Sequence, residues 1–178
     1  MSLTAGRPPA RGWRRFAGDR RGVAAIEFAM LAIPFFLLIF ALIETALIFL
    51  GEFTLDQAAT RVARLVRTGE AQKAALSADD FRKAICTEVS YLLKCADIAI
   101  DLKVYQSFAD LPPPPAVQNG SLNTAGFGYQ LGGTQAVQAL RIYYKWPVLT
   151  DMMRSTLSDM SDGSHLLSSI VVFQTEPY

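Results

Sequence analysis

The chain has 178 residues, 51% of them hydrophobic, and its 17 Lys and Arg against 16 Asp and Glu give a formal net charge of +1. This length suits one domain of ordinary size with enough apolar material for a core. The small net charge hides an asymmetry, because residues 1–27 carry six arginines and two acidic residues whereas residues 28–50 carry one ionisable side chain, Glu44. No folded basic face accompanies the arginines, so we expect no nucleic-acid partner.

Residues 28–50 predict one transmembrane helix. These 23 residues would form a helix of roughly 34 Å, enough to cross a hydrocarbon core of about 30 Å. Fifteen of them are Leu, Ile or Phe, which together favour insertion by about 4 to 9 kcal/mol, against roughly 3 kcal/mol for one charge such as Glu44. A cleavable secretory signal has a shorter apolar region, so it fits less well.

The arginines before this segment predict its orientation. Short basic flanks stay on the cytoplasmic side, so we expect the N-terminus in the cytoplasm and everything after Leu50 outside, which for a bacterial chain is the periplasm. The expected organisation is a basic leader over residues 1–22, a transmembrane helix over 23–50, an amphipathic continuation over 51–68 and a periplasmic domain over 69–178.

The helical pattern continues past the membrane segment. Apolar residues recur three and four apart from Leu55 to Val66, with arginines on another face, which indicates an amphipathic helix. Gly69 is a natural stop. We therefore predict one helix from about Val23 to Thr68, with Pro34 removing one backbone hydrogen bond inside it.

A shorter helix is predicted over residues 78–92, because Ser77 followed by Asp80 is typical of a capping box. Cys86 lies in this helix and Cys95 follows it. In one straight helix the two Cα atoms would be about 13 Å apart, whereas a disulfide needs less than about 7 Å. We expect a disulfide in an oxidising compartment, which requires the helix to end early. Two buried thiols or a metal pair are the alternatives, and a single histidine disfavours the metal.

Three strands are predicted after this helix. Alternation of apolar and polar residues marks residues 97–105 and 139–146, and residues 168–176 are rich in β-branched side chains. Between the first two strands a loop holds four prolines and several glycines, and between the last two a short helix could turn Met152, Met153, Leu157 and Met160 inward. The expected fold class is α+β, a long N-terminal helix followed by a small domain with an antiparallel sheet of about three strands.

The sequence contains no motif of a known active site. No nucleophile elbow, phosphate-binding loop or zinc-protease motif occurs. The one histidine, His165, lies beside Asp159 and Asp162 without a nucleophile in a recognisable setting, so we read it as a histidine at a loop end. We expect no enzyme activity, no cofactor, no metal and no small-molecule substrate.

Glu27 stands where the basic leader meets the apolar helix, and an ionised carboxylate is costly beside hydrocarbon. If the chain were cut after Gly22, Val23 would gain a cationic α-amino group, and a helix places residues four apart on one face. In a bundle of such helices each Glu27 could meet the amine of a neighbour, so that the two charges neutralise each other. Alternatively, Glu27 marks the bilayer edge, and Glu44 could snorkel or face another helix.

The basic leader, Gly22, Glu27 and Phe28 before a long helix resemble the class III signal of type IV pilin-like proteins. Almost the whole chain is similar to the TadE-like minor pilins, or pseudopilins, of the tight-adherence (Tad/Flp) pilus system. Four further segments carry this resemblance: LDQAATRVARLVRTGEAQ, DIAIDLKVYQSF, LRIYYKWPVLT and VVFQTEPY.

The resemblance implies a function in pilus assembly. A membrane prepilin peptidase would cut between Gly22 and Val23, and Glu27 would be the carboxylate used in assembly. The implied partners are the inner membrane, this peptidase, other pilins or pseudopilins and the Tad machinery, with possible incorporation into an extracellular adhesive pilus. An uncleaved single-pass anchor with a periplasmic scaffold or binding module is the alternative.

Overall fold

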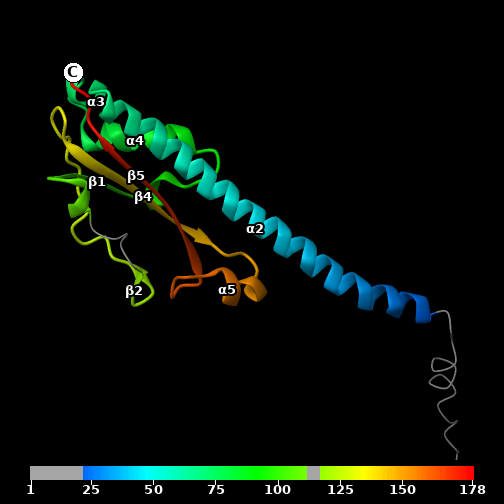
Figure 1. The fold of residues 1–178 in the computed structure, drawn as a ribbon. Helices are drawn as coiled ribbons and strands as arrows, with labels where there is room; N and C mark the ends of the chain where they lie inside the picture. Colours follow the sequence, from blue (N-terminus) through cyan, green and yellow to red (C-terminus); the bar gives the residue numbers. More distant parts are fainter. Residues whose placement is uncertain (1–21, 112–116) are drawn as a thin grey trace, which may run out of the picture. The chain divides into compact units, whose positions relative to one another are not determined.

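The computed structural model describes residues 22–111 and 117–178 (Figure 1). The arginines of the leader, up to residue 21, and the four-proline segment lie outside the described residues. The elements in chain order are α2 (Val23–Arg67), α3 (Glu70–Lys73), α4 (Ala78–Val89), η2 (Cys95–Asp97), β1 (Ile98–Tyr105), η3 (Phe108–Asp110), β2 (Val117–Gln118), β3 (Ser121–Leu122), β4 (Val137–Pro147), α5 (Asp151–Leu157) and β5 (Ser164–Gln174). The chain divides into two compact units, residues 1–40 and 41–178.

The predicted long helix is confirmed as α2, which begins at Val23 and ends at Arg67 with Pro34 inside it. Residues 22–40, the described part of the first unit, include no buried residue. The remainder of α2 belongs to the second unit and buries one face, as the amphipathic pattern predicts. Gly69 follows with φ 77°, a left-handed conformation that glycine adopts at little cost and that ends the helix.

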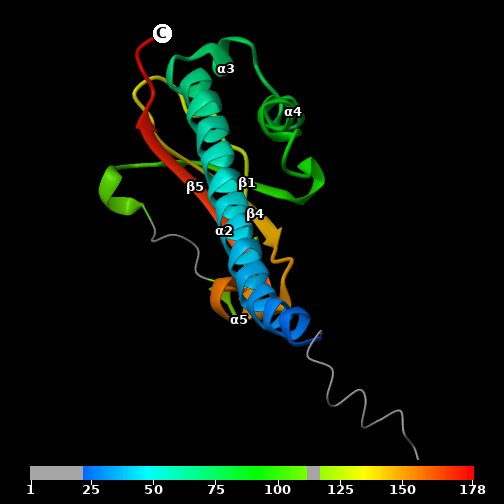
Figure 2. The ribbon, with the colours of Figure 1, turned by 90° about the vertical axis from the view of Figure 1, so that its right-hand side faces the viewer.

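The second unit contains the predicted antiparallel sheet, with strand order β1-β4-β5. Ile100 pairs with Ile142, and Leu140 pairs with both Leu102 and Val171. Because side chains alternate along a strand, these residues all face one side of the sheet. Residues 41–67 of α2 and the helix α4 lie on that side (Figures 1 and 2). One hydrophobic core fills the space between the sheet and the two helices. The fold is therefore α+β, as predicted.

The opposite face of the sheet differs from the half-buried pattern expected for it. Asp101, Arg141 and Tyr143 belong to the predicted polar sides of their strands, yet all three are buried. The segment between β1 and β4 covers this face: the Gly128 N–H donates to Asp101 at 2.9 Å, and the Phe127 ring lies 5.7 Å from that of Tyr143. The alternation of apolar and polar residues shows which residues of a strand share a face of the sheet. It does not show whether another segment covers that face.

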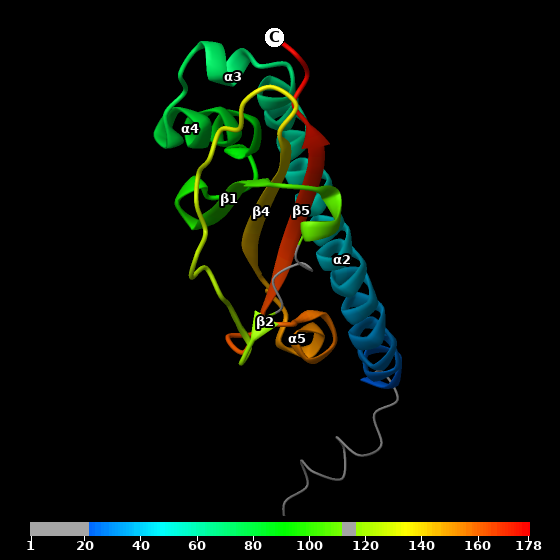
Figure 3. The ribbon, with the colours of Figure 1, turned by 60° about the vertical axis from the view of Figure 1, so that its left-hand side comes forward.

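Two element boundaries and the exposure of one methionine also differ from the prediction. The helix α4 ends at Val89 instead of continuing to about residue 92, and the chain then turns back towards β1. β5 begins at Ser164, four residues earlier than expected, because it pairs along the whole of β4. In α5 Met152 is exposed instead of facing inward, although Met160 is buried. Figure 3 shows α5 and β2 together at the end of the sheet where β4 ends and β5 begins.

Tyr143 gives a pH-dependent prediction. Burial raises the pKa of its hydroxyl from 10.0 to about 12, with Arg141 lowering it and Asp101 raising it in smaller measure. The unfolded chain therefore ionises Tyr143 at lower pH than the folded chain does. The contribution of this pKa difference to the free energy of unfolding is complete below about pH 10. It is lost as the pH rises towards about 12, by at most about 1.4 kcal/mol per pH unit.

The control for this effect is Tyr143→Phe. The Tyr143 hydroxyl has no hydrogen-bond partner among the described residues, so its removal is expected to be neutral or stabilising at neutral pH. Urea unfolding of the full chain in detergent, at neutral pH and in the alkaline range, measures both effects. Equal alkaline losses in the two proteins would contradict the prediction.

Candidate functional site

The proposed cleavage point lies at the beginning of α2. Val23 is the first residue of the helix and Gly22 precedes it. Both residues are exposed, and a Cβ added at Gly22 would have no atom within 4 Å. A larger side chain at position 22 therefore meets no steric obstacle within the described structure.

Glu27 lies one helical turn after Val23 and is exposed. It has no hydrogen bond and no ion pair with any residue that the structure describes. Residues four apart in a helix lie on one face, so Val23 and Glu27 share a side of α2. The carboxylate is thus displayed at the surface of the helix, without a neutralising group among the described residues.

The residues after Glu27 form a helix surface that is apolar on all sides. In the described part of the chain, α2 is the one helix long and apolar enough to cross a membrane, and none of its most apolar 18-residue window is buried. Large exposed side chains include Phe28, Leu31, Phe35, Phe36, Leu38 and Phe40. Exposure of this kind over several turns indicates contact with lipid or with other helices.

Glu44 is the second acidic residue of this helix, and it is buried, with 3% of its surface exposed. Its carboxylate accepts hydrogen bonds from the Leu149 N–H and from the Thr150 hydroxyl. The Thr150 N–H also donates to it, at 3.2 and 3.3 Å from the two oxygens. Thr150 is the N-cap residue of α5. The carboxylate therefore accepts from the N–H of the N-cap residue and from the N–H of the residue before it.

The helix and the sheet are joined further along α2. A Cβ on Gly51 would lie 2.8 Å from Leu167 and 3.2 Å from Trp146, so the missing side chain lets the sheet approach the helix closely. The Ser169 hydroxyl donates to Asp56 at 2.9 Å. The domain and the second half of α2 thus form one packed unit.

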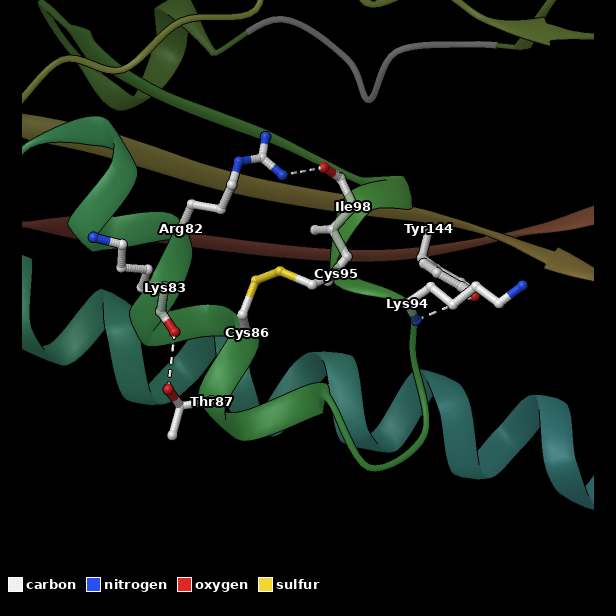
Figure 4. The surroundings of a disulfide bond; sticks show 8 residues. All are labelled: Arg82, Lys83, Cys86, Thr87, Lys94, Cys95, Ile98 and Tyr144. Atoms are coloured by element: carbon white, nitrogen blue, oxygen red, sulfur yellow. Dashed lines mark hydrogen bonds between the residues drawn. A yellow bond between two sulfur atoms is a disulfide. The ribbon is translucent and has the colours of Figure 1, made fainter.

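Cys86 and Cys95 form a disulfide in the structure, with their Cα atoms 5.4 Å apart. Figure 4 shows how it connects the last turns of α4 to η2, immediately before β1. The early end of α4 brings the two cysteines within reach. Beside the bridge, Arg82 donates to the Ile98 carbonyl at 2.9 Å, and the Lys94 N–H approaches the Tyr144 hydroxyl at 3.5 Å.

Removing the bridge is expected to destabilise the domain. Closing a loop of this length stabilises a fold by about 2 to 3 kcal/mol on the chain-entropy model, so the double variant Cys86→Ser, Cys95→Ser should lose about that much in chemical unfolding. Reductant should lower the stability of the unsubstituted chain and leave the variant unchanged. A reductant effect of equal size in both proteins would contradict this interpretation.

His165 lies at the start of β5, between two carboxylates. Its Nδ1 is 3.5 Å from Asp159, and its Nε2 is 3.9 Å from Glu52 of α2. Asp162, the other acidic neighbour in the sequence, instead accepts the Ser164 N–H at 3.0 Å. Among the described residues no group of three or more His, Cys, Asp or Glu side chains is arranged to hold a metal ion.

The structure thus keeps the predicted site residues in three separate places. Gly22, Val23 and Glu27 lie together at the start of α2, Glu44 accepts hydrogen bonds from the residues that lead into α5, and the cysteines join α4 to η2. Sequence reasoning missed the partner of Glu44 and the link from Glu52 to His165. A charge inside an apolar run was the signal for Glu44, but its donors are 105 residues away in the chain.

Comparison with known proteins adds one finding. No curated protein and no solved structure matches the chain. A family model described as TadE-like protein matches residues 22–64. This segment begins at the residue before α2 and contains both Glu27 and Glu44. The resemblance of this sequence to the TadE-like family is therefore confirmed over residues 22–64.

Proposed function

We propose that this protein is a TadE-like pseudopilin that takes part in assembling a Tad (Flp-type) adhesive pilus. One observation carries the proposal: Glu27 is exposed, lacks a partner among the described residues, and lies one turn after the start of a helix whose first turns bury nothing. The family match over residues 22–64 supports it.

The proposed sequence of events begins in the inner membrane, with the N-terminus in the cytoplasm and the domain in the periplasm. A prepilin peptidase hydrolyses the peptide bond between Gly22 and Val23, which releases the leader and leaves a cationic amine on Val23. That amine and Glu27 are each costly at an apolar boundary when unpaired. Pairing between neighbouring subunits removes both costs, so cleavage favours assembly with other pilins.

The domain supports this role by its position along α2. Its packing occupies the helix from Glu44 onward, while the described residues before position 41 bury no side chain. The first part of the helix is therefore available to lipid before assembly and to partner helices during it. The proposed role needs no catalysis by this chain and no cofactor.

Measurement of the mature mass tests the proposal. We expect protein from native membranes to begin at Val23, and Gly22→Leu to remain at full length. Gly18→Leu makes the same change four residues earlier and should still be processed. Recovery of full-length protein from membranes that make functional pili would instead favour an uncleaved single-pass anchor carrying a periplasmic scaffold.

A further inference from the structure

The hydrogen bonds to Glu44 determine what lies beside this part of α2. Leu149 and Thr150 donate to its carboxylate, so the segment of residues 148–153, called the foot below, is held against the helix at that level. Two apolar side chains of the foot nevertheless face outward: Leu149 is 68% exposed and Met152 is 52% exposed. An exposed leucine and an exposed methionine within one short segment indicate contact with a partner.

In the proposed function, on which this inference rests, α2 anchors the chain in a membrane. The length of the helix then indicates what contacts the exposed side chains of Leu149 and Met152. Twenty-one residues separate Val23 from Glu44, which corresponds to about 32 Å of helix rise. The hydrocarbon core of a bilayer is about 30 Å thick. A helix that enters this core near Val23 therefore leaves it near Glu44, six residues before the end of the membrane segment expected from the sequence. The foot lies at the level of Glu44.

The charges around the foot suit the headgroup layer better than the hydrocarbon. Arg154 pairs with Asp151 at 3.2 Å, and Lys145 pairs with Asp162 at 3.3 Å. All four side chains are substantially exposed, which hydrocarbon would penalise. Exposed apolar side chains beside exposed ion pairs are the pattern of a segment that lies in the membrane interface.

We propose that the foot is a membrane-contact site, at which Leu149 and Met152 enter the boundary between lipid headgroups and acyl chains on the outer side of the bilayer. Glu44 makes this contact possible. Its carboxylate, at the level where the helix leaves the hydrocarbon, faces the donors of the foot and not the lipid. The domain is thereby held at the membrane surface by a second contact besides α2.

Depth-dependent quenching tests this proposal on the full-length chain in vesicles of phosphatidylcholine and phosphatidylglycerol. Single variants Leu149→Cys and Met152→Cys carry an environment-sensitive fluorophore, and the disulfide between the native cysteines keeps them from being labelled without reductant. Phe36→Cys reports on the apolar part of α2. Thr60→Cys is the matched control, because it is exposed on the same helix but lies sixteen residues beyond Glu44.

We expect the probes at 149 and 152 to emit at shorter wavelength than the probe at 60, and lipids spin-labelled near the headgroup to quench them several-fold more strongly. Spectra at 149 and 152 that match those at 60, with the probe at 36 still quenched by lipids spin-labelled in the acyl chain, would overturn the membrane-contact site and leave the membrane anchor intact. A probe at 36 that these acyl-labelled lipids do not quench would overturn both. A blue shift that disappears on dilution with lipid would indicate contact between copies, and would also overturn the proposal.

Discussion

Replacing Glu27 with alanine is expected to leave the protein in the membrane and to remove it from assembled pili. The loss of a charge favours insertion, so α2 should still anchor the chain. In assembly, however, the amine of Val23 would have no carboxylate to neutralise it. An unpaired charge costs up to about 3 kcal/mol, the value at the centre of a bilayer, and that cost lowers an equilibrium constant by at most on the order of 100-fold.

Two measurements separate insertion from assembly in this variant. Resistance to alkaline extraction reports membrane insertion, and the amount of the chain in sheared pili reports incorporation. Glu27→Gln keeps the shape of the side chain without its charge, so it should be incorporated into pili as poorly as Glu27→Ala. Glu27→Asp keeps the charge and should retain part of the incorporation. Incorporation of Glu27→Ala at the normal level would remove the charge pair from the mechanism.

Replacing Glu44 with alanine is expected to destabilise the domain and to leave the candidate cleavage site unchanged. The carboxylate accepts from two backbone N–H groups and one hydroxyl, and a buried donor left without a partner costs about 1 to 3 kcal/mol. We therefore expect a loss of about 2 to 5 kcal/mol in the free energy of unfolding. Proteolysis within residues 148–163 should become faster, because the two residues that lead into α5 lose the acceptor of their N–H groups.

The control for Glu44→Ala is the same substitution at Glu27 of the same helix. Glu27 has no partner among the described residues, so its replacement should not change domain stability. Glu44→Gln retains one carbonyl acceptor and should lose less stability than alanine does. Chemical unfolding in detergent and limited proteolysis measure these differences. If the two alanine variants proved equally stable, the hydrogen bonds of Glu44 would not hold the domain to the helix.

Local patterns in the sequence were enough to predict most of the fold. The helix α2 follows from an apolar run that continues as an amphipathic repeat, and its end follows from Gly69, which adopts a left-handed conformation. The start of α4 follows from Ser77, whose hydroxyl accepts the Asp80 N–H at 3.2 Å. Each of these features depends on residues within a few positions of one another, so the sequence displays them directly.

The candidate processing site is likewise visible in the sequence. Gly22, Val23 and Glu27 lie within six consecutive residues, and their relation depends on helical spacing alone. The expected pairing of Val23 and Glu27 between subunits stays a prediction, since it concerns contacts with other chains.

The tertiary structure decided which polar residues are buried and what they contact. Asp101 and Tyr143 stand at positions that alternate as a solvent-facing side would, yet both are buried, with Gly128 and Phe127 of the segment between β1 and β4 against them. Glu44 looks like an isolated charge in an apolar helix until the chain returns 105 residues later to supply its donors. By itself the sequence determined the elements and their apolar faces, because these follow from periodicity. The partners of buried charges depend on which distant segments meet, and only the packed structure determines that.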